Sequence, residues 1–293
     1  FLDGLYDALE KAKNSTKKLQ SLLMRIQRIR VFDSACGSGN FLIIAYKELR
    51  KFEMAVLKAL DELGEQSVMF ISGIRLTQFY GIEIDDFAHE IALLSLWLAE
   101  NQMNKLFEAE FGYSEPMLPL KDSGNIFHGN ALRLNWTEVC PKRDEKGDLE
   151  VYVCGNPPFL GSKGRSPEQN KDMSLVFHAF EAYGMIDYVG AWYWKAAKYI
   201  KNSNAKFALV ATNSIVQGEQ VAQLWRPIFR NGLAISFAHT TFSWSNSAKD
   251  KAAVHVVVIG VANSIDVKTP CLYAENKEGK AIRTYVKSIS PYL

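Results

Sequence analysis

Residues 30–41 are Arg30-Val-Phe-Asp-Ser-Ala-Cys-Gly-Ser-Gly-Asn-Phe41, and this stretch decides the expected fold. A short apolar segment ends at Asp33, and a turn that contains Gly37 and Gly39 follows it. From Phe41 to about residue 63, apolar residues recur at spacings of three and four, which predicts a helix. The stretch is therefore a strand, a glycine-bearing turn and a helix, the unit from which parallel sheets are built.

The same alternation continues through most of the chain. Further strands are predicted at residues 78–84, 125–129, 150–154, 206–212, 234–239 and 254–261, and helices at 87–100, 173–183, 188–200 and 219–230. A polar helix is predicted before the first strand at residues 5–29, a loop at 107–124, and short strands and turns at 263–293. This order predicts an α/β fold with a doubly wound, mostly parallel seven-stranded sheet, ending in an antiparallel edge hairpin.

Composition restricts the class of protein. With 293 residues, of which 48% are hydrophobic and 23% charged, the chain can bury a large core as a soluble globular protein. It begins with Phe1 and contains no apolar stretch of about 18 residues, so we expect a fragment of a longer, non-membrane protein. The four cysteines lack the spacing of a zinc site or a disulfide framework, which predicts no metal and a cytoplasmic location.

The net charge of +2 does not by itself indicate a nucleic-acid partner, so any basic surface must be local. The lysines and arginines between residues 11 and 30 are better explained as the solvated face of a helix. Lys163, Arg165 and Lys171 follow a proline-rich motif, and their position makes them candidates for contacts with phosphate groups.

The turn after the first strand is a candidate cofactor site. Ligands of doubly wound sheets bind beyond the carboxyl ends of the strands, where Gly37 and Gly39 would let the backbone approach a ligand. Asp33 could receive an ammonium group, and Glu83 at the end of the second strand could hold both hydroxyls of a ribose. Because the spacing of dinucleotide-binding glycines is absent, a nucleoside cofactor fits better than NAD.

Asn130, at the end of the third strand, has two open interpretations. Its amide could accept a hydrogen bond from an adenine amine of the cofactor, or it could serve only as a turn former. The candidate cofactor-binding residues are Asp33, Ala35, Cys36, Gly37, Gly39, Asn40, Phe41, Glu83, Ile84, Asn130 and Ala131.

The candidate catalytic motif is Asn156-Pro-Pro-Phe159, which directly follows the apolar strand at 150–154. An exocyclic amine is a poor nucleophile because its lone pair is delocalised into the ring. Acceptors on both N–H bonds, namely the Asn156 side-chain oxygen and the Pro157 carbonyl, would favour a tetrahedral nitrogen. Pro157 and Pro158 stiffen the turn, and Phe159 offers a stacking surface to a flat base extruded from a duplex.

Asp33 to Phe41, Gly81-Ile-Glu-Ile-Asp85 and Asn156 to Phe159, in that order, resemble the amino-methyltransferases of restriction-modification systems, and more closely the MmeI-like group. Residues 79–100, 212–220 and 239–246 support the resemblance. It implies the Rossmann-like class I methyltransferase fold, S-adenosylmethionine as cofactor, and N6 of an adenine in double-stranded DNA as methyl acceptor. It also implies that Phe242 can approach the extruded base. In that family an aspartate is commoner at the position of Asn130.

The resemblance also implies an organisation. Residues 1–30 would be a helical lead-in, 31–262 the catalytic domain, and 263–293 the start of a C-terminal extension or target-recognition region. A nuclease would lie elsewhere in a prokaryotic parent polypeptide, since this chain has no nuclease cluster. The alternatives are a methyltransferase of RNA adenine or protein glutamine, which pose the same chemical problem, and a catalytically silent nucleic-acid-binding module of a defence complex.

Overall fold

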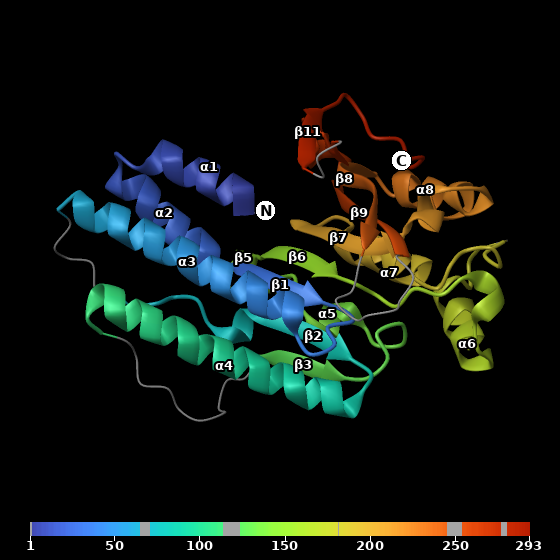
Figure 1. The fold of residues 1–293 in the computed structure, drawn as a ribbon, viewed down its shortest axis with the longest axis horizontal. Helices are drawn as coiled ribbons and strands as arrows, with labels where there is room; N and C mark the ends of the chain where they lie inside the picture. Colours follow the sequence, from blue (N-terminus) through green and yellow to red (C-terminus); the bar gives the residue numbers. More distant parts are fainter. Residues whose placement is uncertain (1, 65–70, 114–123, 181, 245–253, 277–279) are drawn as a thin grey trace. The chain divides into compact units, whose positions relative to one another are not determined.

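The computed structural model describes residues 2–64, 71–113, 124–180, 182–244, 254–276 and 280–293. The chain is an α/β protein made of two compact units, residues 1–129 and 130–293 (Figure 1). The predicted domain ranges, 1–30, 31–262 and 263–293, stay predictions beside this division. Within the described part, none of the helices combines the length and the apolar character that a membrane crossing requires.

The described residues of the first unit form three parallel strands and four α-helices. β1 pairs with β2 through Val31 and Phe79, and β2 pairs with β3 through Gly81 and Ile126, so β2 is central. All three strands were predicted, and they are present. The elements are α1 (Leu2–Ala12), α2 (Thr16–Gln27), β1 (Ile29–Asp33), α3 (Asn40–Glu62), η1 (Leu76–Gln78), β2 (Phe79–Glu83), α4 (Asp86–Phe111) and β3 (Asn125–His128).

The helices of this unit differ from the prediction in two places. The expected helix at 5–29 is two helices, because the chain turns at residues 13–15 and Ser15 begins α2 in an extended conformation. α4 continues past residue 100 because its later turns bury Met103 and Phe107. It ends only at Gly112, whose φ of 77° is the left-handed conformation that commonly terminates helices. Residues 114–123 of the expected loop lie outside the described residues.

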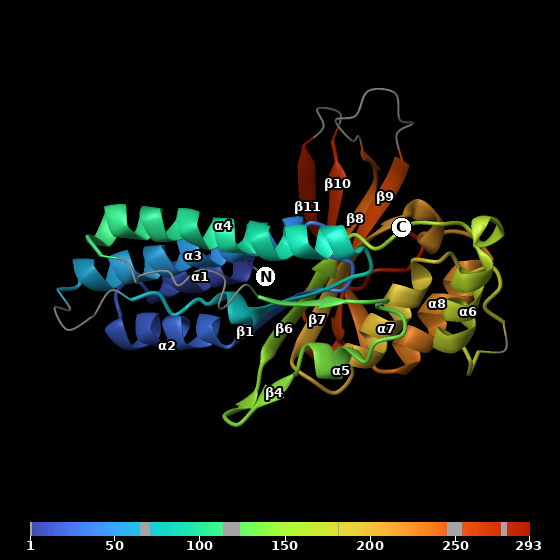
Figure 2. The same cartoon turned by 90° about the horizontal axis from the view of Figure 1, so that it is seen from below.

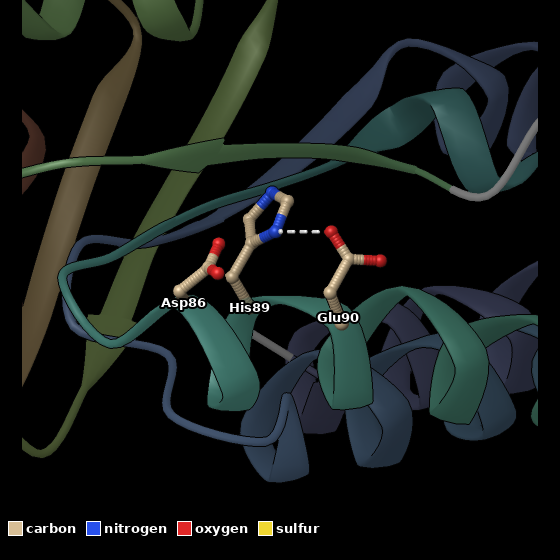
Figure 3. A group of neighbouring side chains, drawn as sticks. All are labelled: Asp86, His89 and Glu90. Atoms are coloured by element: carbon tan, nitrogen blue, oxygen red, sulfur yellow. Dashed lines mark hydrogen bonds and ion pairs between the residues drawn. The ribbon is translucent and has the colours of Figure 1, made fainter.

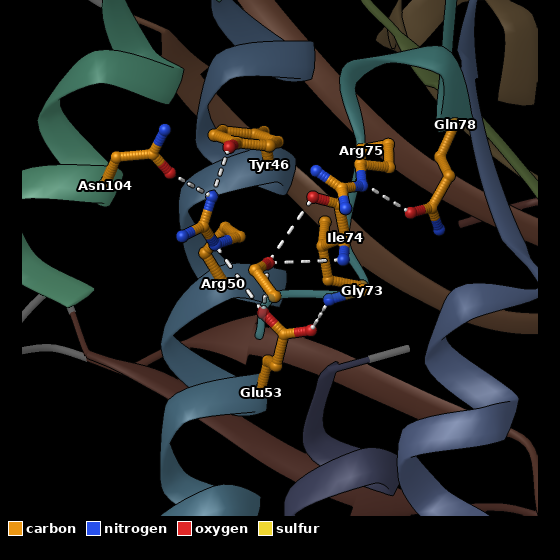
Figure 4. A network of polar contacts seen from close by, with 9 residues as sticks. Tyr46, Arg50, Glu53, Gly73, Ile74, Arg75, Gln78 and Asn104 are labelled. Atoms are coloured by element: carbon orange, nitrogen blue, oxygen red, sulfur yellow. Dashed lines mark hydrogen bonds and ion pairs between the residues drawn. The ribbon is translucent and has the colours of Figure 1, made fainter. Parts of the chain in front are cut away.

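A buried polar network fixes the segment that leads into η1 and β2 (Figure 4). Arg50 and Glu53 of α3 are each 2% exposed. The Arg50 guanidinium donates to the side-chain oxygen of Asn104 on α4 at 3.0 Å. The Glu53 carboxylate accepts hydrogen bonds from the Ser72 hydroxyl and the Gly73 amide, both at 2.6 Å. The network therefore ties α3 to α4 and to the chain entering β2.

The second unit contains a mixed sheet in the order β11-β10-β8-β9-β7-β6 (Figure 2). β6 and β7 are parallel, as are β8 and β10, whereas β7/β9, β8/β9 and β10/β11 are antiparallel. The elements are α5 (Trp136–Val139), β4 (Arg143–Asp144), β5 (Gly147–Asp148), β6 (Glu150–Gly155), η2 (Ser162–Gly164), α6 (Pro167–Val176), α7 (Gly190–Ile200), β7 (Ala205–Thr212), η3 (Asn213–Val216), α8 (Glu219–Arg230), β8 (Leu233–Trp244), β9 (Val254–Asn263), η4 (Ser264–Asp266), β10 (Cys271–Glu275) and β11 (Ala281–Tyr285).

The antiparallel pair predicted from residues 234–239 and 254–261 is present as β8 and β9. Two further strands, β10 and β11, extend the sheet beyond β8, and they supply the short strands expected after residue 263. The expected helix at 173–183 is instead α6, which begins at Pro167. The signal lies in the sequence: Ser166 and Gln169 form a reciprocal capping box, with proline at the first helical position.

β8 changes the face that its side chains occupy partway along its length. Ile235 pairs with Val261 and Phe237 with Gly260, so Ser236 is an extra residue in the ladder. Such a bulge reverses the alternation of side chains, because the side-chain period of a strand is two. Ile235 is buried, whereas Phe237 lies half-buried on the opposite face.

Candidate functional site

The glycine-bearing turn connects β1 to α3 in a left-handed conformation. Gly37 has a φ of 54° and Gly39 a φ of 85°, values that side-chain-bearing residues rarely adopt. The turn is held by a hydrogen bond from the Gly39 amide to the Cys36 carbonyl at 2.8 Å, and from the Cys36 amide to the Ile82 carbonyl at 3.0 Å. A Cβ atom on Gly37 would meet no atom within 4 Å. The turn therefore presents bare backbone to open space.

Asp33 ends β1 as a buried carboxylate that is 1% exposed. Its Oδ1 atom accepts a hydrogen bond from the Ala35 amide at 3.0 Å, while Oδ2 has no partner among the described residues. Burial, with a smaller contribution from the negative charge of Glu83, raises the pKa of Asp33 to about 7 against the opposing effect of the Ala35 hydrogen bond. A cationic ligand at Oδ2 would offset both the cost of burying the negative charge and its repulsion from Glu83.

Glu83 ends β2 and organises the backbone around it. Its Oε2 atom accepts from the Gly37 amide at 2.7 Å, and Oε1 accepts from the Ile84 and Asp85 amides, each at 2.9 Å. A carboxylate has about four acceptor positions, so three are already in use. The predicted bidentate contact with a ribose would require at least one backbone amide to yield its position, and that contact stays a prediction.

The remaining candidates of the first unit surround these groups. Burial raises the pKa of the Cys36 thiol, and the charges of Asp33 and Glu83 add to this effect, so Cys36 is not an activated nucleophile. Asn40 is exposed in the first turn of α3, and Phe41 is half-buried. Ile84 is 65% exposed, and the neighbouring Phe87, which the sequence reasoning missed, is 74% exposed.

The first turns of α4 carry Asp86, His89 and Glu90, whose potential metal-ligating atoms lie within 4.8 Å of one another (Figure 3). Both ring nitrogens of His89 already face oxygen atoms: Nδ1 lies 3.1 Å from Glu90 Oε1, and Nε2 lies 3.2 Å from the Ile126 carbonyl. A metal ion would have to displace one of these contacts, so the group is explained without an ion.

Asn130 serves as a turn former in the second unit. Its side-chain oxygen accepts from the Leu132 amide at 2.9 Å, and its amide nitrogen donates to Asp172 at 2.9 Å. Ala131 is 5% exposed, and its carbonyl accepts from the Trp136 indole at 2.9 Å. The contact of Asn130 and Ala131 with a cofactor stays a prediction, since these hydrogen bonds already account for the Asn130 side chain and the Ala131 carbonyl.

The motif at 156–159 follows β6 as predicted. β6 alternates between buried and half-buried residues up to Gly155, which pairs with Leu209 of the parallel strand β7. Pro157 is buried, Phe159 is half-buried, and Asn156 is exposed. The Asn156 amide makes no hydrogen bond to any residue in the described ranges. The end of β6 is therefore followed by a side-chain amide that has no hydrogen-bond partner among the described residues and by two conformationally restricted prolines.

Arg165 holds the loop that follows this turn. Its guanidinium donates to the carbonyls of Ser162, Gly184 and Ile186 at 3.3, 2.9 and 3.1 Å. Burial lowers the pKa of Arg165, an effect that the nearby Asp187 opposes. Since three of its five donors already serve the backbone, a phosphate contact would use the remaining two.

The other two basic candidates are exposed. Lys163 lies in η2 and Lys171 lies on α6. Contacts of Lys163, Arg165 and Lys171 with DNA phosphates stay predictions.

Sequence reasoning missed a polar cluster at the carboxyl end of β7. Asp187 is 9% exposed, and its Oδ2 atom accepts a short hydrogen bond from the Ser214 hydroxyl, which also contacts the Thr212 hydroxyl at 2.7 Å. The next residue, Tyr188, donates its amide to the Leu160 carbonyl at 2.9 Å. The cluster thus borders the loop after Phe159. A Thr-Asn-Ser run at a strand end was its signal, but no local pattern marks Asp187.

Phe242 lies half-buried on β8, opposite Val256. Its ring centroid is 6.3 Å from that of His239. Stacking of Phe242 on a target base stays a prediction. Residues 245 and 246, the end of the stretch used for the family resemblance, lie outside the described residues.

Comparison with known proteins gives consistent results. A family model described as "MmeI, DNA-methyltransferase domain" matches residues 9–274. The chain is 48% identical to DNA methyltransferase A of Bacillus subtilis (strain 168), covering all of this chain and 32% of the relative. It also matches the type IIL restriction-modification enzyme MmeI, solved in complex with DNA, with a TM-score of 0.90 and 41% identity over all of this chain and 39% of that one.

A more distant match shows the fold alone. The type IIG restriction endonuclease BpuSI superposes with a TM-score of 0.51 and 12% identity, over 88% of this chain and 26% of that one. The chain thus spans about a third of the curated relative and two fifths of the MmeI chain.

Proposed function

Because the chain belongs to the MmeI DNA-methyltransferase domain family, we propose that it transfers a methyl group from S-adenosylmethionine to N6 of an adenine extruded from double-stranded DNA. It acts as the modification domain of a restriction-modification protein. The observation that carries the proposal is the Asn156 amide, which has no hydrogen-bond partner among the described residues, in an Asn-Pro-Pro-Phe turn at the end of a parallel strand.

The first unit has features that suit the cofactor. The buried carboxylate of Asp33 offers its Oδ2 atom, which has no partner in the described part of the chain, to the ammonium group of the methionine part. Gly37 leaves room beside the backbone, and Glu83 offers its remaining acceptor position to a ribose hydroxyl. When bound, S-adenosylmethionine supplies an electrophilic methyl group on a sulfonium. The chain's own residues bind and orient it.

The second unit supplies the groups for the acceptor. The Asn156 side-chain oxygen and the Pro157 carbonyl accept the two N–H bonds of the adenine amine, which favours a tetrahedral nitrogen and stabilises its developing positive charge. Phe159 stacks on the base, and Phe242 is a second candidate for this contact. No general base is required, because the methylated ammonium is acidic enough to lose its proton to water.

The acceptor is reached by base extrusion, which costs a few kcal/mol that stacking and edge hydrogen bonds offset. Support for duplex DNA as substrate comes from MmeI, whose structure was solved in complex with DNA. Since the chain spans only part of its relatives, we place a nuclease and a target-recognition region elsewhere in the parent polypeptide, in the prokaryotic cytoplasm.

The test uses the full-length parent protein with radiolabelled S-adenosylmethionine and, separately, duplex DNA, RNA and protein. We expect label in DNA at adenine N6. Label only in RNA or protein would establish one of the other amine or amide acceptors, and DNA binding without transfer to any acceptor would establish a silent binding module.

A variant separates the catalytic turn from the cofactor site. Asn156→Ala should abolish transfer while cofactor affinity, measured by calorimetry, stays near that of the wild type. Asn170→Ala, an exposed asparagine on α6, is the matched control and should retain transfer. Full activity in Asn156→Ala would contradict the assigned role.

A further inference from the structure

Asp172 of α6 is a buried carboxylate on which three hydrogen-bond donors converge. It is 3% exposed. Its Oδ1 atom accepts from the Arg133 guanidinium at 2.7 Å, and its Oδ2 atom accepts from the Asn130 side-chain amide and from the Tyr188 hydroxyl, both at 2.9 Å. All of these residues belong to the second unit. An ionised carboxylate can only accept hydrogen bonds, so each of these side chains must face Asp172 with a donor.

This requirement fixes the orientation of the Asn130 amide. An amide side chain can be turned either way, and its hydrogen-bond partners decide which atom faces which neighbour. Asp172 requires the nitrogen on its side, and the Leu132 amide, which donates to the Asn130 oxygen at 2.9 Å, requires the oxygen on the other. The oxygen has a second lone pair, which no described residue occupies. Because Asn130 is only half-buried, this lone pair is the position that a ligand can use.

The backbone of the same turn is held by other contacts. The Asn130 carbonyl accepts from the Leu134 amide at 3.1 Å. From α7, the Lys195 ammonium group donates to the carbonyls of Leu132 and Leu134 at 3.0 and 2.7 Å. Since these contacts fix the main chain without Asp172, the hydrogen bond from Asn130 to Asp172 orients the side chain alone. A change of Asp172 should therefore alter the direction of the Asn130 amide and not the course of the turn.

We propose that Asp172 is a positioning residue for the cofactor: it keeps the Asn130 oxygen available to the exocyclic amine of the cofactor's adenine, and thereby makes the site selective for a purine that carries this amine. The inference rests on the proposed function, because it takes S-adenosylmethionine as the ligand. An amine donates, so it pairs with the Asn130 oxygen, whereas the nitrogen of a reversed amide would face it donor to donor. The selectivity for the amine thus depends on a carboxylate that acts through Asn130.

The experiment measures the binding of two nucleoside ligands to the full-length parent protein by calorimetry. They are S-adenosylhomocysteine, the product form of the cofactor, and its deamino analogue, in which hydrogen replaces the exocyclic amine of the purine. The wild type should bind S-adenosylhomocysteine about tenfold more tightly, since one hydrogen bond is worth this order. Asp172→Asn keeps the shape of the side chain but replaces one acceptor with a donor, and should reduce this preference to about twofold or less. A role in folding alone would weaken both ligands equally and leave the preference unchanged.

A reciprocal exchange tests the pairing of the two side chains. Asn130→Asp alone brings two carboxylates into the 2.9 Å contact, and their repulsion should weaken the binding of S-adenosylhomocysteine about tenfold at pH 8. The double variant, Asn130→Asp with Asp172→Asn, again has a donor facing an acceptor and keeps an oxygen at position 130, so it should recover the affinity and the preference of the wild type. Glu168→Gln is the matched control, because it removes a charge of the same sign from the first turn of α6, where it also interacts with Arg133, and it should leave the preference unchanged.

The outcomes are separable from those of the proposed function. An unchanged preference in Asp172→Asn, or an equal loss of preference in Glu168→Gln, would overturn the positioning role even if the protein methylates DNA. Equal binding of the two ligands by the wild type would also overturn it, because Asn130 would then not receive the amine. If Asp172→Asn does not fold, the double variant decides: recovery of the fold and of the preference supports the pairing, and failure of either refutes it. Absence of methyl transfer in the wild type would refute the proposed function instead.

Discussion

Asp33→Asn should stabilise the protein in the absence of cofactor, and the gain should depend on pH. Burial raises the pKa of this carboxyl from its ordinary 3.8 to about 7. At about 1.4 kcal/mol for each tenfold change in ionisation, the ionised form costs the folded state about 4 kcal/mol. The cost is absent below the pKa of the unfolded chain, grows as pH rises toward 7, and is constant above it. Asparagine carries no such charge.

The net effect is smaller because asparagine adds an amide donor at the position of Oδ2, which has no partner among the described residues. An unsatisfied buried donor costs about 1–3 kcal/mol. We therefore expect Asp33→Asn to raise the free energy of unfolding by about 2 kcal/mol at pH 8 and to give no gain near pH 5. Affinity for S-adenosylmethionine should fall at the same time, because its ammonium group loses a carboxylate.

Urea unfolding followed by circular dichroism at both pH values measures the first effect, and calorimetry measures the second. Asp61→Asn removes a negative charge from an exposed position near the end of α3 and is the matched control. If the wild type and Asp33→Asn lose or gain stability in parallel as pH rises, the buried-charge explanation is wrong. If their cofactor affinities are equal, Asp33 does not receive the ammonium group.

Three further predictions concern other parts of the two units. Arg165→Met should lower turnover about tenfold, because the loop that Arg165 holds would be displaced. The slope of log DNA affinity against log salt concentration should stay unchanged, whereas a slope lowered by about one would indicate a phosphate contact instead. Gly39→Ala should cost about 1–2 kcal/mol in thermal unfolding because its φ of 85° is left-handed, whereas Gly4→Ala, within α1, should not. Glu53→Ala should cost about 3–5 kcal/mol by leaving the positive charge of Arg50 buried without its carboxylate, and the double change of Arg50 and Glu53 to Met should recover most of this loss in urea unfolding.

The elements of the fold could be predicted from the sequence wherever buried residues recur at a regular spacing along the chain. All seven predicted strands are present, because runs such as 150–155 have the apolar content that a sheet covered by helices requires. The break after α1 was not accessible in this way, because residues 13–15 suit a helix surface as well as a turn. β10 and β11 are short, and β11 is exposed throughout, so they carry little of the hydrophobic pattern on which such predictions depend.

The candidate site also has parts that could be predicted from the sequence and parts that could not. The glycine turn and the Asn-Pro-Pro-Phe motif are local, so their residue types alone indicate their conformation. The contact between Gly37 and Glu83 joins residues 46 positions apart, and the contact between Asp187 and Ser214 joins residues 27 positions apart. Such contacts depend on the tertiary fold, and no local spacing encodes them. The same holds for Arg165, whose donors serve carbonyls up to 21 positions away.

The extra residue in β8 has a consequence for changing the sequence of this strand. In a library of all substitutions along β8, charged residues should be tolerated least at the buried positions. These positions are 233 and 235 before Ser236 and 238 after it, so the buried side chains change from odd-numbered to even-numbered positions at the extra residue. A segment grafted from a relative would keep its side chains on the intended faces only if it carried the same extra residue. Removal of that single residue would exchange the two faces of everything downstream.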